Sequence, residues 1–272
     1  MIDMNRILFH MELCRNFRSL VVWSLVIGLL IFFTMSFFRT VLQYQQQISG
    51  VIQMIPLAAM KVRGFSNIND IFSVMGFYAA NNIVYMMLLG SIYAIVLSSN
   101  ILLKEEYNKT AEFLMSRPIT RNEIFFSKFA LAFMNILILN LFVAIVSLIT
   151  IEAFSKSDFS IAPFLILTFY TLLLNLLFGS LGFFIASVMK RSKPVTFFCV
   201  GIVLVFYFLY SISRIPGING DFGYISPFKW VNIEVLSPLY SFELKRVAAF
   251  SGISIFFIML SGFLYRRKDI LT

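Results

Sequence analysis

The chain has 272 residues, of which 60% are hydrophobic and only 13% are charged. A soluble domain has about twice that share of charged residues, so the composition excludes an ordinary soluble protein and indicates a polytopic membrane protein. The net charge of +9 is explained by basic loops beside a membrane rather than by a nucleic acid partner, and we expect no nucleic acid binding.

Residues 1–19 alternate charged and apolar side chains, which predicts an amphipathic helix lying in the membrane interface. Six continuous apolar runs follow, of about the length that a helix needs to cross the hydrocarbon core. They cover residues 20–38, 83–103, 124–149, 161–189, 195–213 and 247–264. Because the runs are continuous and not alternating, they predict helices rather than barrel strands. The chain is therefore expected to be one all-α transmembrane domain, residues 1–272, with six transmembrane helices.

Basic residues set the expected orientation. The short segments Lys190–Pro194 and Arg266–Asp269 carry the clearest excess of Lys and Arg. Such segments stay on the cytoplasmic side of a membrane. Since six spans return the chain to the side on which it began, we predict that the N- and C-termini are both cytoplasmic.

The last outer loop, residues 214–246, contains Pro227 and Pro238 on either side of Trp230. Prolines bound helices, so the loop predicts a short helix that is either re-entrant or interfacial. An amphipathic loop resting on the headgroups, with Trp230 as an aromatic-belt residue, is an equally good interpretation.

Residues that could carry catalysis or ion coupling are scarce. The phosphate-binding pattern G-x-x-x-x-G-K-[ST] and the metal-binding or redox patterns H-E-x-x-H and C-x-x-C do not occur, and the single histidine, His10, lies in the N-terminal segment. The expected spans hold almost no ionisable residue of the kind that ion-coupled transporters use. We predict no catalytic, cofactor or metal site in this chain and an energy source outside it.

Polar and small residues inside the spans are expected to join helices. The amides at depth belong to Asn135, Asn140 and Asn175. For these we favour interhelical hydrogen bonds over substrate contact. A patch of small residues on the fourth span consists of Gly179, Ser180, Gly182 and Ala186. It indicates close packing against another helix.

The connection between the second and third spans contains a helix start. Thr120 and Glu123 have the T-x-x-E spacing of a capping box directly before an apolar run. Pro118 disfavours a helical conformation at Arg117. The third span is therefore expected to begin near Thr120, and a separate short helix to end just before Pro118.

That short helix carries an apolar knot, Phe113, Leu114 and Met115, among charged residues. Exposed apolar clusters rimmed by charge often mark contact sites, and a helix laid in a groove is one standard contact. The alternative is that the knot folds back onto the bilayer surface. The residues alone leave both interpretations open.

The stretch LLKEEYNKTAEFLMSRPITRNEIFFSKF resembles the first cytoplasmic loop of the membrane subunits of type-2 ABC exporters. That loop reads approximately K-E-x-x-x-x-T-x-E-x-L-x-x-x-P-[IV]-[ST]-R, followed by a spacer and a lysine. The matching residues are Lys104, Glu105, Thr110, Glu112, Leu114, Pro118, Ile119, Thr120, Arg121 and Lys128. A glycine expected just before Thr110 is replaced by Lys109, and outside the loop the resemblance is largely one of hydropathy.

The resemblance implies a non-enzymatic permease subunit of an ATP-driven exporter in a bacterial plasma membrane. It implies a second permease copy or paralogue, and cytoplasmic ATP-binding subunits that hold ATP and Mg. The short helix would be the coupling helix that docks on those subunits. The residues expected to couple are Glu105, Glu106, Thr110, Glu112, Phe113, Leu114, Met115, Arg117, Pro118 and Arg121. The expected cargo is a peptide, a drug or another amphipathic molecule; the alternatives are a permease for cofactor maturation and a non-transporting assembly or sensing protein that docks an ATPase.

Overall fold

A computed structural model describes residues 6–52, 56, 59–60, 71–108, 120–155, 159–189, 195–231 and 242–268. Every regular element in these residues is a helix, and none is a strand. The elements are α1 (Arg6–Gln43), α2 (Gln45–Ile52), α5 (Val74–Tyr78), the π-helix η1 (Ala79–Ile83), α6 (Val84–Tyr107), α8 (Arg121–Phe154), α9 (Ile161–Val188), α10 (Val195–Ile212), the 3₁₀-helix η2 (Gly220–Ile225), α11 (Pro227–Trp230) and α12 (Leu244–Arg267).

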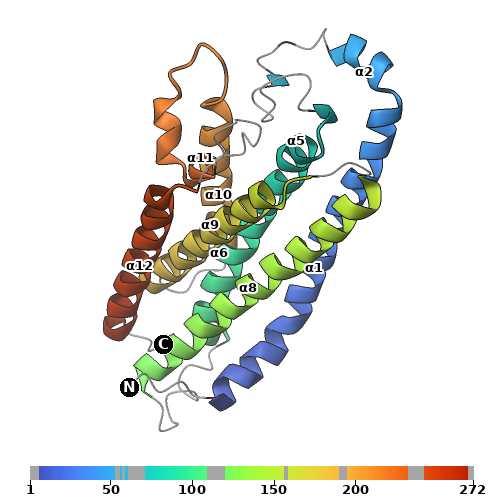
Figure 1. Cartoon of the computed structure of the whole chain (residues 1–272). Coiled ribbons are helices and arrows are strands. Elements are labelled where there is room, and N and C mark those ends of the chain that lie inside the picture. The colour runs from blue at the N-terminus through green and yellow to red at the C-terminus, as the bar shows by residue number, and fades with distance from the viewer. Residues whose placement is uncertain are drawn as a thin grey trace.

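Six helical segments in the described part of the chain are long and apolar enough to cross a membrane. They are α1, the continuous segment α5–η1–α6, α8, α9, α10 and α12, so the predicted number and order of spans are confirmed. Both ends of the chain lie at the same end of the bundle (Figure 1). We call this the terminal end, and the end that carries α2 and α11 the opposite end.

The helix expected over residues 1–19 is not a separate element. From Arg6 onward the chain forms the start of α1, which runs unbroken to Gln43. No proline or glycine occurs between Arg6 and Ile27, and without such a residue nothing in the sequence ends the helix. The charged segment is therefore the start of the same helix that forms the first candidate span, and this helix extends beyond the predicted residues 20–38 at both ends.

The second span begins earlier than the expected residue 83. The Ser73 hydroxyl accepts a hydrogen bond from the Gly76 amide at 3.1 Å, which caps the helix that starts at Val74. A π-turn then covers Ala79–Ile83 before α6 continues. The polar pair in this turn, Asn81 and Asn82, interrupts the apolar run, so apolar length alone did not predict the first turns of the helix.

The start of α8 confirms the predicted capping box. The Glu123 amide donates to the Thr120 hydroxyl at 3.3 Å, and the Thr120 amide donates to Glu123 Oε2 at 3.0 Å. The helix begins at Arg121 and continues to Phe154, beyond the predicted residue 149.

Replacing Thr120 by alanine is expected to lower the free energy of unfolding by about 1 kcal/mol, because the N-cap bond to α8 is lost. Ser160 precedes α9 in the same position but makes no side-chain cap bond, so Ser160→Ala is the matched control. Thermal unfolding in one detergent compares the two variants. An equal loss of stability in both would show that the Thr120 cap contributes nothing.

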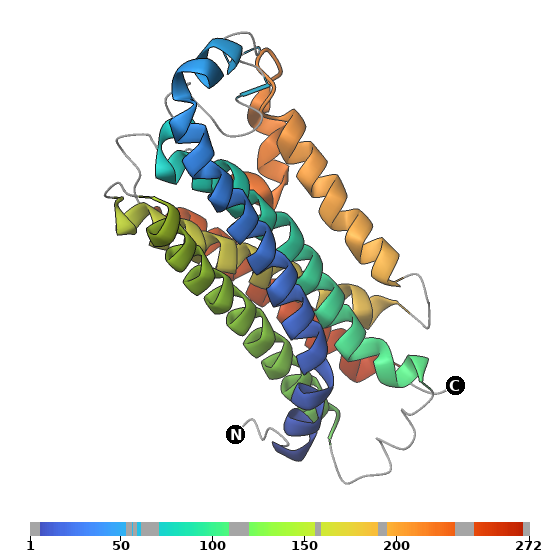
Figure 2. The same cartoon turned by 90° about the vertical axis from the view of Figure 1, so that its right-hand side faces the viewer.

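Helix α6 lies in the middle of the bundle (Figures 1 and 2). It packs most extensively against α9, and α9 also packs against α12. Helix α1 packs against α8, and α10 packs against α6. The small-residue patch makes the α6–α9 contact close. A Cβ atom added to Gly182 would lie 2.5 Å from the main-chain oxygen of Ile95. The predicted close packing is confirmed.

Buried amides join three helices in the middle of the bundle. Asn175 of α9 donates to Asn140 of α8 at 3.1 Å and accepts from Ser91 of α6 at 3.2 Å. Asn135 instead donates to the Leu131 carbonyl one turn earlier in its own helix. Interhelical bonding is therefore confirmed for Asn140 and Asn175 and not for Asn135.

The loop between α10 and α12, predicted to be the last outer loop, contains a short helix that begins at the first of its two prolines. Helix α11 begins at Pro227 and ends at Trp230, whose ring packs against Phe250 of α12 with centroids 5.3 Å apart. Pro238 lies outside the described residues. Whether this helix is re-entrant or interfacial stays a prediction.

Candidate functional site

The segment expected to couple lies between α6 and α8. Seven of the ten residues assigned to coupling lie outside the described residues: Thr110, Glu112, Phe113, Leu114, Met115, Arg117 and Pro118. The structure describes the other three, Glu105 and Glu106 at the end of α6 and Arg121 at the start of α8. Glu105 and Glu106 form the first root of the segment and Arg121 forms the second, and the contacts of these three residues define the site.

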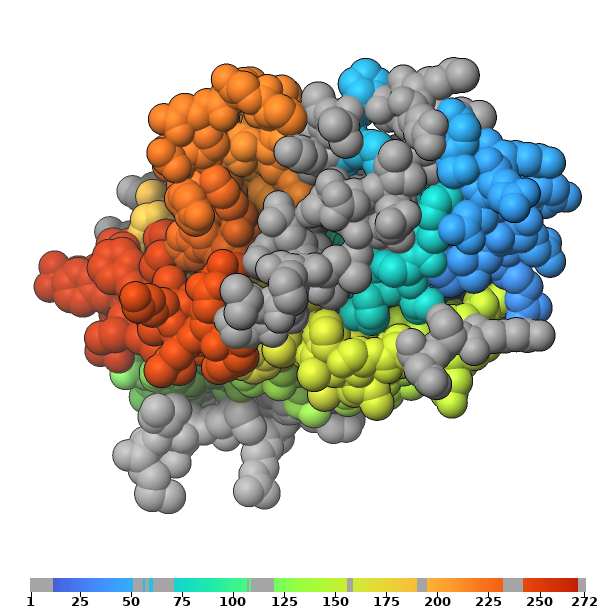
Figure 3. All heavy atoms as spheres, turned by 45° about the horizontal axis from the view of Figure 1, so that its top comes forward, coloured from blue at the N-terminus to red at the C-terminus, as the bar shows by residue number. Residues whose placement is uncertain are grey.

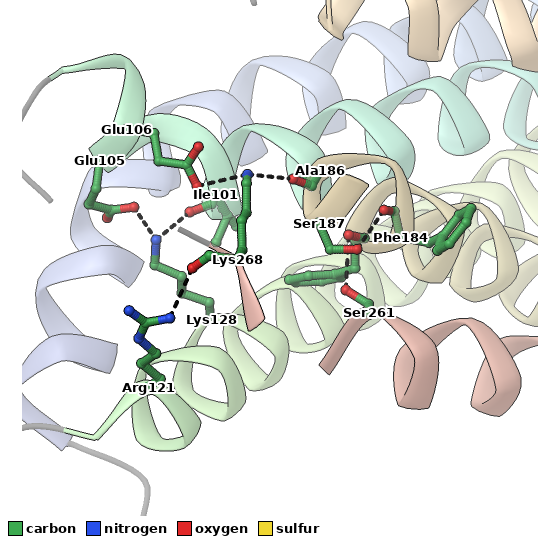
Figure 4. Close-up of polar contacts among 11 residues, drawn as sticks. Ile101, Glu105, Glu106, Arg121, Lys128, Phe184, Ala186, Ser187, Ser261 and Lys268 are labelled. Atoms are coloured by element: carbon green, nitrogen blue, oxygen red, sulfur yellow. Dashed lines mark hydrogen bonds and ion pairs between the residues drawn. The ribbon is translucent and has the colours of Figure 1, made fainter. Parts of the chain in front are cut away.

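Three consecutive residues at the end of α6 each pair with a different part of the bundle. Successive residues of an α-helix point about 100° apart, so three in a row face three directions. Lys104 forms an ion pair with Glu12 of α1, and Glu105 forms one with Lys128 of α8. Glu106 accepts from Lys268, directly after α12, at 2.8 Å (Figure 4). We call these six residues the charged hub.

The charged hub is largely removed from solvent. The Lys128 side chain is 1% exposed, and those of Glu12 and Lys268 are 2% and 5% exposed. Buried charges are tolerated only when they are paired and hydrogen-bonded. The lysines meet this condition with additional acceptors, because Lys128 also donates to the Ile101 carbonyl at 2.8 Å and Lys268 to the Ala186 carbonyl at 3.1 Å.

Arg121, at the second root, binds the end of α12 beside the charged hub. Its guanidinium donates to the main-chain oxygens of Arg266 and Lys268 at 3.1 and 2.9 Å. The last carbonyls of a helix have no partner within the helix, so Arg121 satisfies carbonyls at the end of α12. Both roots therefore contact Lys268, directly after α12, and Figure 4 shows the Arg121–Lys268 and Glu106–Lys268 contacts side by side.

A sequence comparison adds the family to this geometry. The sequence model of the family described as "ABC-2 family transporter protein" matches residues 6–270. The chain belongs to the ABC-2 transporter family. It is an ABC-2 type permease, a multi-pass membrane component of a family that in general works with ATP-binding subunits. The comparison with curated proteins finds no match.

The resemblance stated from the loop sequence is thus confirmed for this ABC-2 permease, and three of the residues predicted to couple lie together. Glu105, Glu106 and Arg121 belong to one cluster, but their charged groups contact other parts of the same chain. Glu12 and Lys268 were not predicted as partners, and Lys128 was predicted only as part of the loop pattern. A lysine inside an apolar span needs a partner, and this signal points to Lys128.

Two further features bear on the permease's chemistry. Among the described residues, no three His, Cys, Asp or Glu side chains are grouped so that they could hold a metal ion. A cavity of about 280 Å³ lies between α6, α8, α9 and α12. Its wall is mainly apolar, with Phe129, Phe133, Leu176 and Phe183, and the few polar groups are serine hydroxyls such as Ser254.

Proposed function

We propose that this ABC-2 permease is a membrane subunit of an ATP-driven exporter in a bacterial plasma membrane. It works with a second copy or a paralogue, and the segment between α6 and α8 docks on a separate cytoplasmic subunit that holds ATP and Mg. The observation that carries this proposal is the charged hub. Both roots of the docking segment are fixed to the bundle and not left as flexible linkers.

The charged hub supports coupling because a fixed root transmits displacement. A push on the docking segment moves Lys104, Glu105 and Glu106, which are tied to α1, to α8 and to the end of α12. In a buried environment of low dielectric, these ion pairs resist separation more than pairs in water do. Movement of the docking segment therefore shifts several spans together, as rigid-body switching between inward- and outward-open states requires.

The orientation and the cargo belong to the same proposal. The terminal end faces the cytoplasm because the basic residues of Arg266–Lys268 lie there. An amphipathic cargo such as a peptide or a drug fits the apolar cavity with its scattered hydroxyl groups, since ligand sites combine apolar walls with a few polar groups.

The test is the double variant Glu112→Lys/Leu114→Asp. We expect it to abolish co-purification of ATP-binding subunits from the native host, identified by mass spectrometry, because it reverses a charge and places a carboxylate in the apolar knot. The variant Ile225→Asp is the matched control, since Ile225 is an exposed apolar residue of the opposite end. Size-exclusion chromatography checks that both variants fold. A double variant that still binds and still stimulates ATP turnover contradicts the coupling assignment.

Reconstituted vesicles test whether the permease transports cargo or only docks the ATP-binding subunit. With the ATP-binding subunit present, we expect ATP-dependent movement of amphipathic test peptides or dyes across the membrane. ATP turnover without movement of any member of a broad panel would instead support a non-transporting assembly or sensing protein.

A further inference from the structure

A second cavity, of about 510 Å³, lies at the opposite end of the bundle, between the end of α10, η2, α11 and the start of α12. Figure 3 looks onto this end, where the orange surface of η2 and α11 meets the red start of α12. Four cationic residues line the cavity: Arg214, Lys229, Lys245 and Arg246. The described lining contains one carboxylate, Glu243.

The carboxylate is already used within the lining. Arg246 donates from Nε and from a terminal nitrogen to the two oxygens of Glu243, both at 2.8 Å. The Glu243 main chain is held in turn by Tyr170 of α9, whose hydroxyl accepts from its amide at 2.8 Å. Glu243 therefore balances Arg246, and Lys229 and Lys245 add two further positive charges to the described lining.

Neutral groups orient Lys229 within the lining. Lys229 donates to the Gly220 carbonyl at 2.5 Å and lies 4.0 Å from the centre of the Tyr224 ring. Carbonyl and ring contacts orient a cation without cancelling its charge. An ammonium has three donors, so Lys229 keeps donors for a ligand.

The wall of the cavity is fixed by its own contacts. Ser226 donates to the Phe206 carbonyl of α10 at 2.7 Å, and the Trp230 ring nitrogen donates to the Tyr224 carbonyl at 2.9 Å. A Cβ atom added to Gly223 would lie 2.2 Å from the Ser213 hydroxyl, so glycine is needed where η2 meets the end of α10. The cationic groups thus sit on a preorganised support, which favours binding.

The surroundings indicate where in the membrane the cavity lies. It lies where α10 ends and α12 begins, and several residues next to its lining residues in the sequence are apolar and exposed, among them Ile215, Ile225 and Leu244. Trp and Tyr are enriched at the level of lipid headgroups, and Tyr224 and Trp230 line the cavity. A ligand in this position has an anionic group in the cavity and an apolar body beside it.

We propose that this cavity binds the phosphate-bearing headgroup of an anionic phospholipid. Lysine and arginine are the usual partners of phosphate oxygens, and a volume of about 510 Å³ is in the range of small-ligand sites. The exposed apolar residues beside it face the acyl chains. This assignment does not depend on the proposed exporter function, because it rests on the lining alone.

The experiment measures the thermal stability of the purified full chain in nanodiscs of phosphatidylcholine with and without phosphatidylglycerol. We expect phosphatidylglycerol to raise the Tm of the wild type, and the increase to shrink at high salt because screening weakens the attraction. The variant Lys229→Gln/Lys245→Gln should lose most of this increase, with binding weakened about tenfold or more. The control variant Arg266→Gln/Arg267→Gln removes two exposed cations at the terminal end and should keep it.

A single variant and an inorganic phosphate control make the result decisive. Lys245 is exposed, so Lys245→Gln alone tests the site if the Lys229 change disturbs η2, and we expect a partial loss of the increase. Inorganic phosphate added to phosphatidylcholine nanodiscs should not reproduce it. The proposal is overturned if phosphatidylglycerol gives no increase, if the control loses as much as the site variant, or if inorganic phosphate protects equally well.

Discussion

Replacing Lys128 by methionine is expected to lower the free energy of unfolding by about 3–5 kcal/mol. The change leaves the Glu105 carboxylate in a largely buried place without its partner, and it removes the donor to the Ile101 carbonyl. An uncompensated buried charge costs far more than the pair itself contributes. Thermal unfolding of the purified protein in one detergent measures the loss.

The second half of the experiment restores charge balance. In Glu105→Gln/Lys128→Met no charge is left unpaired, so most of the lost stability should return, because replacing both members of a buried pair is often nearly neutral. Lys245→Met is the control for removing a cation from an exposed site. If the double variant is as unstable as Lys128→Met, the Glu105–Lys128 pair is not the reason for the loss.

The same double variant separates folding from coupling. It keeps a stable bundle but lacks the ionic tie between the root of the docking segment and α8. If the charged hub transmits displacement, the variant binds the ATP-binding subunit and yet moves less cargo per ATP hydrolysed. Unchanged transport per ATP in reconstituted vesicles would show that the tie to α8 serves stability only.

Local signals in the sequence predicted the helices well. The number and order of the spans follow from apolar length, and the start of α8 follows from the Thr120–Glu123 capping box, which needs only four consecutive residues. The division of α1 failed because charge alternation suggested a change of environment, while ending a helix requires a breaker. A pattern of polarity places a helix near water but does not determine where it stops.

The charged hub could be predicted only in part, because its pairs are distant in the sequence. Lys104 and Glu12 are 92 positions apart, and Lys268 and Glu106 are 162 apart. Composition could show that Lys128, inside an apolar run, needs an acceptor. It could not choose among the carboxylates near the terminal end, since that choice depends on how α1, α6, α8 and α12 pack together.

The packing of α6 against α9 gives the second large effect. Gly182→Ala is expected to destabilise the protein by about 1–3 kcal/mol, because overpacking a tight contact forces a shift. The added Cβ would lie 2.5 Å from the Ile95 main-chain oxygen, and a backbone atom inside a helix cannot rotate away as a flexible side chain does. The two helices must separate, and α6 carries three residues of the charged hub, Lys104, Glu105 and Glu106.

Gly201 of α10 is the matched control. A Cβ added there meets nothing within 4 Å, so Gly201→Ala should leave the stability unchanged or raise it by up to about 1 kcal/mol, since alanine favours helices over glycine. The difference in Tm between the two alanine variants measures the closeness of the α6–α9 contact apart from any general effect of losing a glycine. Equal behaviour of the two would mean that α6 and α9 are not held as close as the structure places them. If the segment between α6 and α8 couples as proposed, a Gly182→Ala protein that folds at low temperature should also lose transport before it loses the ATP-binding subunit. The docking segment itself is unchanged in this variant, while α6, to which it is joined, has moved.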